Sequence, residues 1–90
     1  MIPLAPAVAE LAPSDAVLTG YDQAHTVTYL LLLDADAVGA DWREVAREVL
    51  GSDPDADAAC ARRTYDSHLA RARWMTTTGY RHLLRGGAPH

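Results

Sequence analysis

Three aspartates near the middle of the chain have a spacing found in calcium-binding loops. Asp53, Asp55 and Asp57 match the first three ligand positions of an EF-hand loop, but the sixth position is Ala58 instead of glycine and the twelfth is Thr64 instead of glutamate. We therefore expect a solvated turn in which Asp55 or Asp57 caps the following helix. The histidines and the one cysteine lack the spacing of a metal site, and no nucleophile motif or phosphate loop is present. The sequence predicts no metal, no cofactor and no catalysis.

The side chains best suited to binding lie on one long predicted helix, from residue 58 to about Met75. Its outer faces carry arginine, which can contact phosphate and guanine, or the carboxylates of a protein partner. The candidate residues for either role are Arg62, Arg63, Ser67, Arg71, Arg73 and Trp74. The alternative is that these arginines form a solvated face whose charge is offset by acids such as Asp66.

Charge is distributed unevenly along the chain. Residues 1–57 contain eleven acids and two arginines, which gives −9, whereas residues 58–90 contain one acid and six arginines, which gives +5. The sum is the net charge of −4, the pI is about 5.3, and lysine is absent. Proteins that hold DNA by neutralising phosphates usually have a basic pI. We therefore expect any DNA contact to be confined to the arginine-bearing helix, and the polarised charge favours a protein partner.

Capping residues and apolar periodicity predict three main helices. The first runs from about Tyr21 to Ala37, with Thr19 and Asp22 as a capping pair and Gly39 in the exit turn. The second is a short helix of about nine residues. Asp41 and Glu44 have the spacing of a capping box, and Gly51 suits a left-handed residue after the helix. Its apolar stripe consists of Trp42, Val45, Ala46 and Val49.

The third helix follows an acidic connection that Pro54 keeps non-helical. Its apolar stripe consists of Ala58, Ala61, Tyr65, His68, Leu69, Ala72 and Met75. On this stripe, His68 is expected to be a hydrogen-bonded core histidine. Thr76 to Gly79 should end the helix, because three β-branched residues precede a glycine.

These elements predict one all-α domain. It is a small helix-turn-helix-like bundle of three main helices plus a short C-terminal helix over residues 80–85. Residues 1–18, with three prolines, are expected to form an extended N-terminal arm, residues 19–85 the domain, and residues 86–90 a frayed end. The single Cys60 excludes an intramolecular disulfide, and no apolar run is long enough to span a membrane, so we expect a cytoplasmic protein.

The first predicted helix carries more apolar residues than one buried face can hold. Tyr29 to Leu33 is an unbroken apolar run, so part of it must face outward. Val27 and Leu31 lie one turn apart on the wet side of the helix, beside Asp34. We expect Val27, Leu30 and Leu31, with Asp34, to form an exposed ridge that binds a partner. The alternative is that the proline-rich arm covers the ridge.

Five runs of residues closely resemble a proteobacterial domain family, the RovC-like DNA-binding domain of type VI secretion regulators. These runs are Leu18–His25, Tyr29–Gly39, Ala40–Arg47, Ser67–Met75 and Gly79–Arg85, so that the resemblance extends over residues 18–85. It implies a helix-turn-helix variant that occurs in activators and as stand-alone small proteins.

The resemblance also implies a function. A short, acidic, stand-alone member of this family is expected to be an antiactivator. Such a protein would bind a LuxR-type quorum-sensing activator (TraR-like) and a fused activator with the same domain (FseA-like), and so repress conjugative transfer of a mobile element. Two departures favour protein binding: the connection after Val45 and Ala46 is long and acidic, and position 31 is Leu where DNA-binding members are expected to be polar. The alternative is a sequence-specific DNA-binding regulator that uses the arginine-bearing helix.

Overall fold

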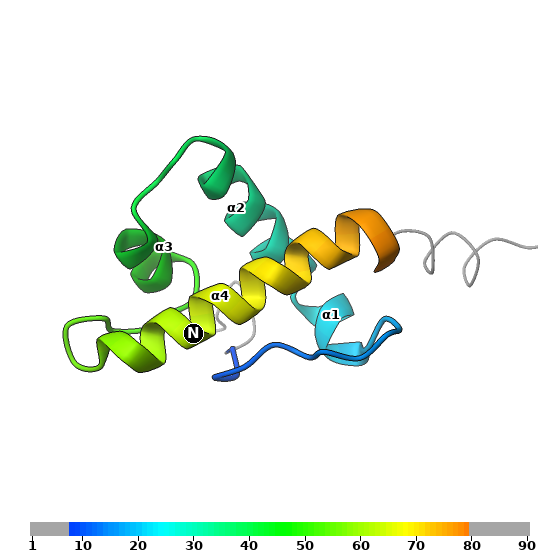
Figure 1. The fold of residues 1–90 in the computed structure, drawn as a ribbon, viewed down its shortest axis with the longest axis horizontal. Coiled ribbons are helices and arrows are strands. Elements are labelled where there is room, and N and C mark those ends of the chain that lie inside the picture. The colour runs from blue at the N-terminus through cyan, green and yellow to red at the C-terminus, as the bar shows by residue number, and fades with distance from the viewer. Residues whose placement is uncertain (1–7, 80–90) are drawn as a thin grey trace, which may run out of the picture.

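The computed structural model describes residues 8–79, and within that range every regular element is helical. The elements are α1 (Gly20–Ala24), α2 (Thr26–Ala37), α3 (Trp42–Glu48), α4 (Ala58–Trp74) and the π-helical turn η1 (Met75–Gly79). The long α4 crosses the molecule, with α2 and α3 on one side and α1 and the irregular residues 8–19 on the other (Figure 1). The predicted all-α class is confirmed. The predicted helix over 80–85, the frayed end 86–90 and the first seven residues of the arm lie outside the described residues.

The first predicted helix is in fact two helices. The Thr19–Asp22 capping box is present, but the helix breaks at His25, where φ is −110° and ψ is 22°. Side chains compete for the carbonyls of this turn: His25 Nδ1 lies 2.9 Å from the Tyr21 oxygen, and the Thr26 hydroxyl donates to Asp22 O. Such back-bonding bends helices. The prediction of one continuous helix was therefore wrong.

Helix α3 is shorter than predicted and is capped differently. Asp41 accepts the backbone N–H of Arg43 at 3.3 Å, not that of Glu44, so a single cap replaces the predicted capping box. The short aspartate side chain reaches the second N–H of the helix, which satisfies one orphan donor. The glycines after α2 and α3 are left-handed as expected, with φ of +72° at Gly39 and +67° at Gly51.

One apolar core lies between α4 and the pair α2 and α3. It consists of Tyr29, Leu32, Val45, Leu50, Tyr65, Leu69 and Ala72. The predicted stripe of α4 is buried from Ala61 to Ala72, whereas Ala58 in the first turn is exposed and Met75, now in η1, is half-buried. Thr64 is buried as well, since its hydroxyl donates to Cys60 O at 3.1 Å and so needs no water.

The threonines after Trp74 do not end the helical winding. The chain continues as η1, and the hydroxyls of Thr76 and Thr77 donate to Arg73 O at 2.9 and 3.1 Å. Both bonds give the Arg73 carbonyl side-chain donors where the chain changes from α-helix to π-helix. The α-helix stops at Trp74, close to the prediction, but the predicted break is a change of helix type.

Candidate functional site

Arg71 was expected on an outer face of α4, and the structure corrects this. Its side chain is only 4% exposed and forms a bidentate ion pair with Asp22, with N···O distances of 2.6 and 2.9 Å. The same guanidinium donates to the backbone oxygens of Asp15 and Val17. Tyr29 donates to Asp22 at 2.8 Å. Arg71 therefore joins the arm, α1 and α2 to α4 and is not available to a nucleic acid.

This network determines the protonation states of Asp22 and Tyr29. Burial would raise the pKa of Asp22, but hydrogen bonds from Arg71, Thr19 and Tyr29 outweigh it and lower the pKa to about 2. Burial, with the hydrogen bond to Asp22, raises the pKa of Tyr29. Asp22 is thus a charged, fully partnered carboxylate at neutral pH. It stabilises the fold and offers nothing to a ligand.

His68 is the hydrogen-bonded core histidine that the sequence predicts. It is fully buried, with Nδ1 2.7 Å from Thr64 O and Nε2 2.6 Å from the Tyr21 hydroxyl. Burial lowers the pKa of His68, which favours the neutral ring. Both ring nitrogens have partners, so His68 has no free position for a metal. Among residues 8–79, no group of three metal-ligating side chains comes together.

The other predicted arginines of α4 are exposed, and each is paired with an acid. Arg62 pairs with Asp66 one turn along the helix, and Arg63 pairs with Glu10 of the arm. Arg73 pairs with Asp36 of α2 at 2.7 Å. Exposed ion pairs of this kind are worth about 0–1 kcal/mol, so a phosphate or a partner's carboxylate can replace the acid at small cost.

The remaining two predicted residues of α4 face the arm. The Ser67 hydroxyl accepts the Ala12 N–H at 3.0 Å, and the Trp74 ring lies 3.8 Å beneath the guanidinium carbon of Arg71. Together with Arg71 they line a groove of about 450 Å³ between α4 and residues 12–16. The structure therefore divides the predicted set: Arg71, Ser67 and Trp74 line the groove beside the arm, whereas Arg62, Arg63 and Arg73 are exposed and ion-paired.

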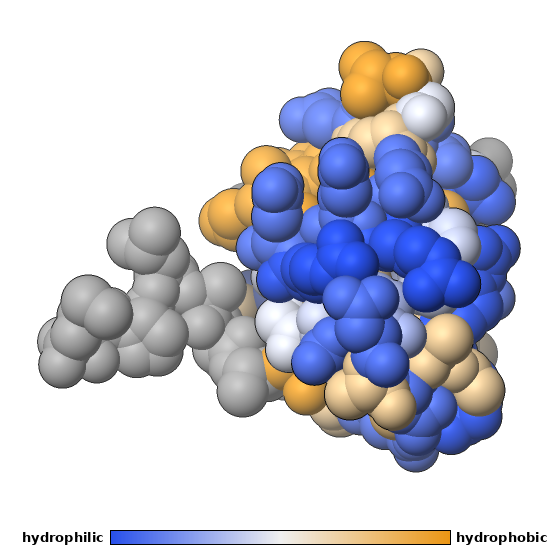
Figure 2. Space-filling model, turned by 90° about the vertical axis from the view of Figure 1, so that its left-hand side faces the viewer, coloured by the Kyte–Doolittle hydropathy of each residue, from blue (hydrophilic) through white to orange (hydrophobic). Residues whose placement is uncertain are grey.

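Two arginines of α3 join the exposed set, and the sequence analysis missed them. Arg43 and Arg62 both lie over Trp42, each with its guanidinium carbon 5.0 Å from the ring centroid. Arg47 is exposed and pairs with Asp55 at 3.3 Å. We call Arg43, Arg47, Arg62 and Trp42 the arginine face. The spacing of Arg43 and Arg47, one helical turn apart beside Trp42, was the available signal. Figure 2 shows that the middle of this end of the molecule is hydrophilic, with apolar residues at its upper and lower edges.

The predicted apolar ridge on α2 is exposed. Val27, Leu30 and Leu31 are 64%, 55% and 48% exposed, and Asp34 is exposed beside them. The described part of the arm contacts α1 and α4 instead, for example through the bond from Ala9 N–H to the Tyr21 hydroxyl. The alternative in which the arm covers the ridge therefore does not hold for residues 8–18.

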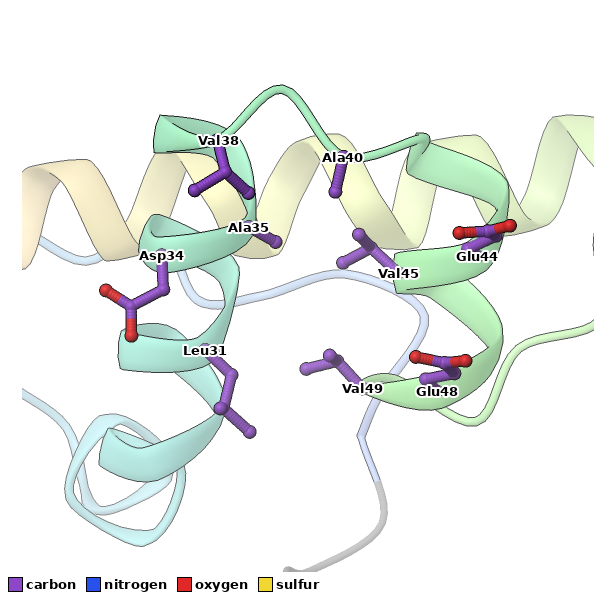
Figure 3. A pocket seen from close by; sticks show the side chains of 9 residues that line it. All are labelled: Leu31, Asp34, Ala35, Val38, Ala40, Glu44, Val45, Glu48 and Val49. Carbon is purple, nitrogen blue, oxygen red and sulfur yellow. The ribbon is translucent and has the colours of Figure 1, made fainter.

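An apolar groove runs between α2 and α3, beside this ridge. Its volume is about 370 Å³. Leu31 and Val49 point toward each other across it, while Asp34 flanks it on α2 and Glu44 and Glu48 flank it on α3 (Figure 3). The remaining lining residues are Ala35, Val38, Ala40 and Val45. The groove combines an apolar floor with acidic sides.

Comparison with known families gives the chain its class. In the helix-turn-helix order expected from the sequence, the short α3 is followed by a connection and then by the long α4, both packed in one all-helical bundle. A family model described as the T6SS transcription factor, DNA binding domain matches residues 4–85 of the 90-residue chain. The chain belongs to this family of DNA-binding domains of transcription factors. A comparison with curated proteins finds no match. Within residues 8–79, no helix is long and apolar enough to cross a membrane.

Proposed function

We propose that this chain regulates transcription by binding DNA through the arginine face. The observation that carries the proposal is that Arg43 of α3 and Arg62 of α4 both stack on the Trp42 ring, while the exposed Arg47 lies one helical turn from Arg43. Arg43 has no carboxylate partner within residues 8–79, and the pairs of Arg47 and Arg62 are exposed and therefore weak. Membership of a family of DNA-binding domains supports this function over the protein-binding alternative.

The acidic surroundings limit how many phosphates the arginine face can contact. The chain has a net charge of −4, so DNA must be held locally and not by a general positive field. With about three phosphates neutralised, the logarithm of affinity should fall with the logarithm of salt concentration with a slope of about −3. Binding should therefore be modest and lost readily as salt rises.

The test is a fluorescence anisotropy titration of a short promoter duplex at about 50 mM salt and above. The triple variant R43A/R47A/R62A should lose binding and flatten the salt slope. The single variant R73A, at the other end of α4, should bind like the original chain. Absence of binding at low salt, or equal loss in R73A, would contradict the proposal.

A second candidate is the antiactivator function that the sequence resemblance implies, in which the chain would act like the antiactivator QseM of rhizobial integrative and conjugative elements. In this function the chain binds TraR-like and FseA-like activators and so represses conjugative transfer. The exposed ridge of Val27, Leu30 and Leu31 beside Asp34 favours it, because monomeric domains seldom leave large contiguous apolar surface uncovered. DNA contact is not needed for this function.

Co-purification with a purified LuxR-type activator tests the second candidate. The substitutions Val27→Asp and Leu31→Asp should abolish co-purification while the helical circular dichroism spectrum is unchanged. Val17→Asp is the matched control, because Val17 is 54% exposed on the arm, away from the ridge. Full co-purification of both ridge variants would remove this candidate.

A further inference from the structure

The acids that flank the α2–α3 groove differ from the acids that pair with exposed arginines. Asp34, Glu44 and Glu48 make no ion pair or hydrogen bond through their side chains within residues 8–79. By contrast, four acids pair with exposed arginines of α3 and α4, namely Glu10, Asp36, Asp55 and Asp66. The groove therefore holds three carboxylates without a partner in the described part of the chain, beside apolar surface.

The spacing of these acids is regular. Glu44 and Glu48 are four residues apart on α3, which corresponds to about 6 Å along the helix axis. Asp34 stands on the opposite side of the groove, on α2 (Figure 3). An apolar strip thus runs between two carboxylates on α3 and Asp34 on α2, whose side chain points away from α3 (Figure 3).

We propose that the α2–α3 groove binds an amphipathic helix of a partner protein, whose narrow apolar stripe lies between two basic flanks. One flank carries Lys or Arg one turn apart to meet Glu44 and Glu48, and the other carries a cation for Asp34. The apolar stripe contacts Leu31 and Val49. This inference deepens the second candidate function and rests on it, since it specifies the chemistry of the partner element.

The charge of the groove favours a basic helix over DNA or a second copy of the chain. A DNA backbone would be repelled by the three carboxylates, which places nucleic acid on the arginine face and not here. A second copy of the chain does not present a matching element within residues 8–79, because the exposed ridge of α2 carries no arginine and the apolar stripe of α4 is buried in its own core. A basic helix laid in an apolar groove uses i, i+3, i+4 anchors together with charge pairing at the rim.

The inference can be tested by measuring how three synthetic helical peptides bind to the full chain. All three peptides contain the same number of leucines. The first has a leucine stripe with arginine on both flanks, the second has the same stripe with glutamate flanks, and the third has arginine but a shuffled stripe. Only the first should bind. In the amide spectrum of the labelled chain, its binding should shift the signals of the groove residues Leu31, Ala35, Val45 and Val49.

Two double variants with equal charge change separate the groove from net charge. E44Q/E48Q should weaken the first peptide about tenfold, as expected for the loss of two rim ion pairs. D55N/D66N removes two acids that lie outside the groove and should leave binding unchanged. Leu31→Asp should abolish binding, which provides a second variant if E44Q/E48Q is poorly folded.

Three results would overturn the inference: equal binding of the basic and acidic peptides, equal weakening by both double variants, or amide shifts confined to the arm and α4. Concentration-dependent dimerisation that Leu31→Asp abolishes would also overturn it, since a second copy would then occupy the surface. If the basic peptide binds at the groove but no LuxR-type activator co-purifies, the antiactivator function fails while the inference stands.

Discussion

The carboxylates on the two sides of α2 differ in their burial and in their hydrogen-bond partners. On the side toward α1 and α4, Asp22 is fully buried and receives hydrogen bonds from Arg71, Tyr29 and the Thr19 backbone. On the side toward α3, Asp34 stands beside an apolar groove with no side-chain partner within residues 8–79. The first carboxylate is part of the fold and cannot be offered to a ligand, whereas the second is not needed by the fold. In this small domain, the charges that stabilise and the charges available for binding are different residues.

Breaking the buried pair should have the largest effect on stability. Arg71→Ala leaves Asp22 charged and buried without its cation, which should lower the free energy of unfolding by about 3–5 kcal/mol. Urea denaturation followed by circular dichroism measures this. Arg73→Ala, which breaks the exposed pair with Asp36, is the control and should change stability by less than about 1 kcal/mol. Similar values for the two variants would erase the contrast between the buried and exposed sides.

Low pH should also destabilise the fold, because it protonates Asp22 and so breaks the same ion pair. The pKa of Asp22 is about 2 in the fold against an ordinary 3.8, so the unfolded chain binds its proton first. The stabilisation is complete above about pH 4 and is lost as pH falls toward 2, and it amounts to about 2 kcal/mol. A carboxyl carbon NMR titration that follows Asp22 directly would test the value. A midpoint near 3.8 would contradict the network described above.

The attachment of the arm to α4 should contribute a smaller amount. Ser67→Ala leaves the Ala12 N–H without its acceptor, and we expect a loss of about 1 kcal/mol. Thermal unfolding measures the loss, and faster exchange of the Ala12 amide proton should accompany it. Unchanged exchange at Ala12 would mean that this bond does not hold the arm.

On the groove side, substitutions should hardly change stability. Leu31→Asp and Glu48→Gln alter exposed side chains, so the free energy of unfolding should stay within about 0.5 kcal/mol of the original. The same denaturation experiment checks this. A loss above about 2 kcal/mol for Leu31→Asp would mean that this surface belongs to the core, and it would remove the groove as a binding site.

Local patterns predicted much of the fold from the sequence. Left-handed glycines at positions 39 and 51, the cap on Thr19 and the buried stripe of α4 depend on residues close in the chain. Sequence periodicity also predicted the exposed ridge, because five consecutive apolar residues cannot all face one side.

Features that depend on distant residues were missed. Periodicity assigns arginine to the outside, so Arg71 was expected to be exposed, although its partner Asp22 is 49 residues away. Similarly, the opposition of Leu31 and Val49 across the groove follows from how α2 and α3 pack on α4. No local pattern encodes that packing.

The bond between Arg71 and the N-terminal segment has a consequence for the order of events on the ribosome. Asp15, Val17 and Asp22 are synthesised before the guanidinium that binds them, which lies 49 to 56 residues further along the chain. Until α4 has been synthesised, Asp22 has no cation and its burial would be unfavourable. Asp22 can therefore be buried with its cation only after α4 has been synthesised, and we expect the helices to pack together only from that point on.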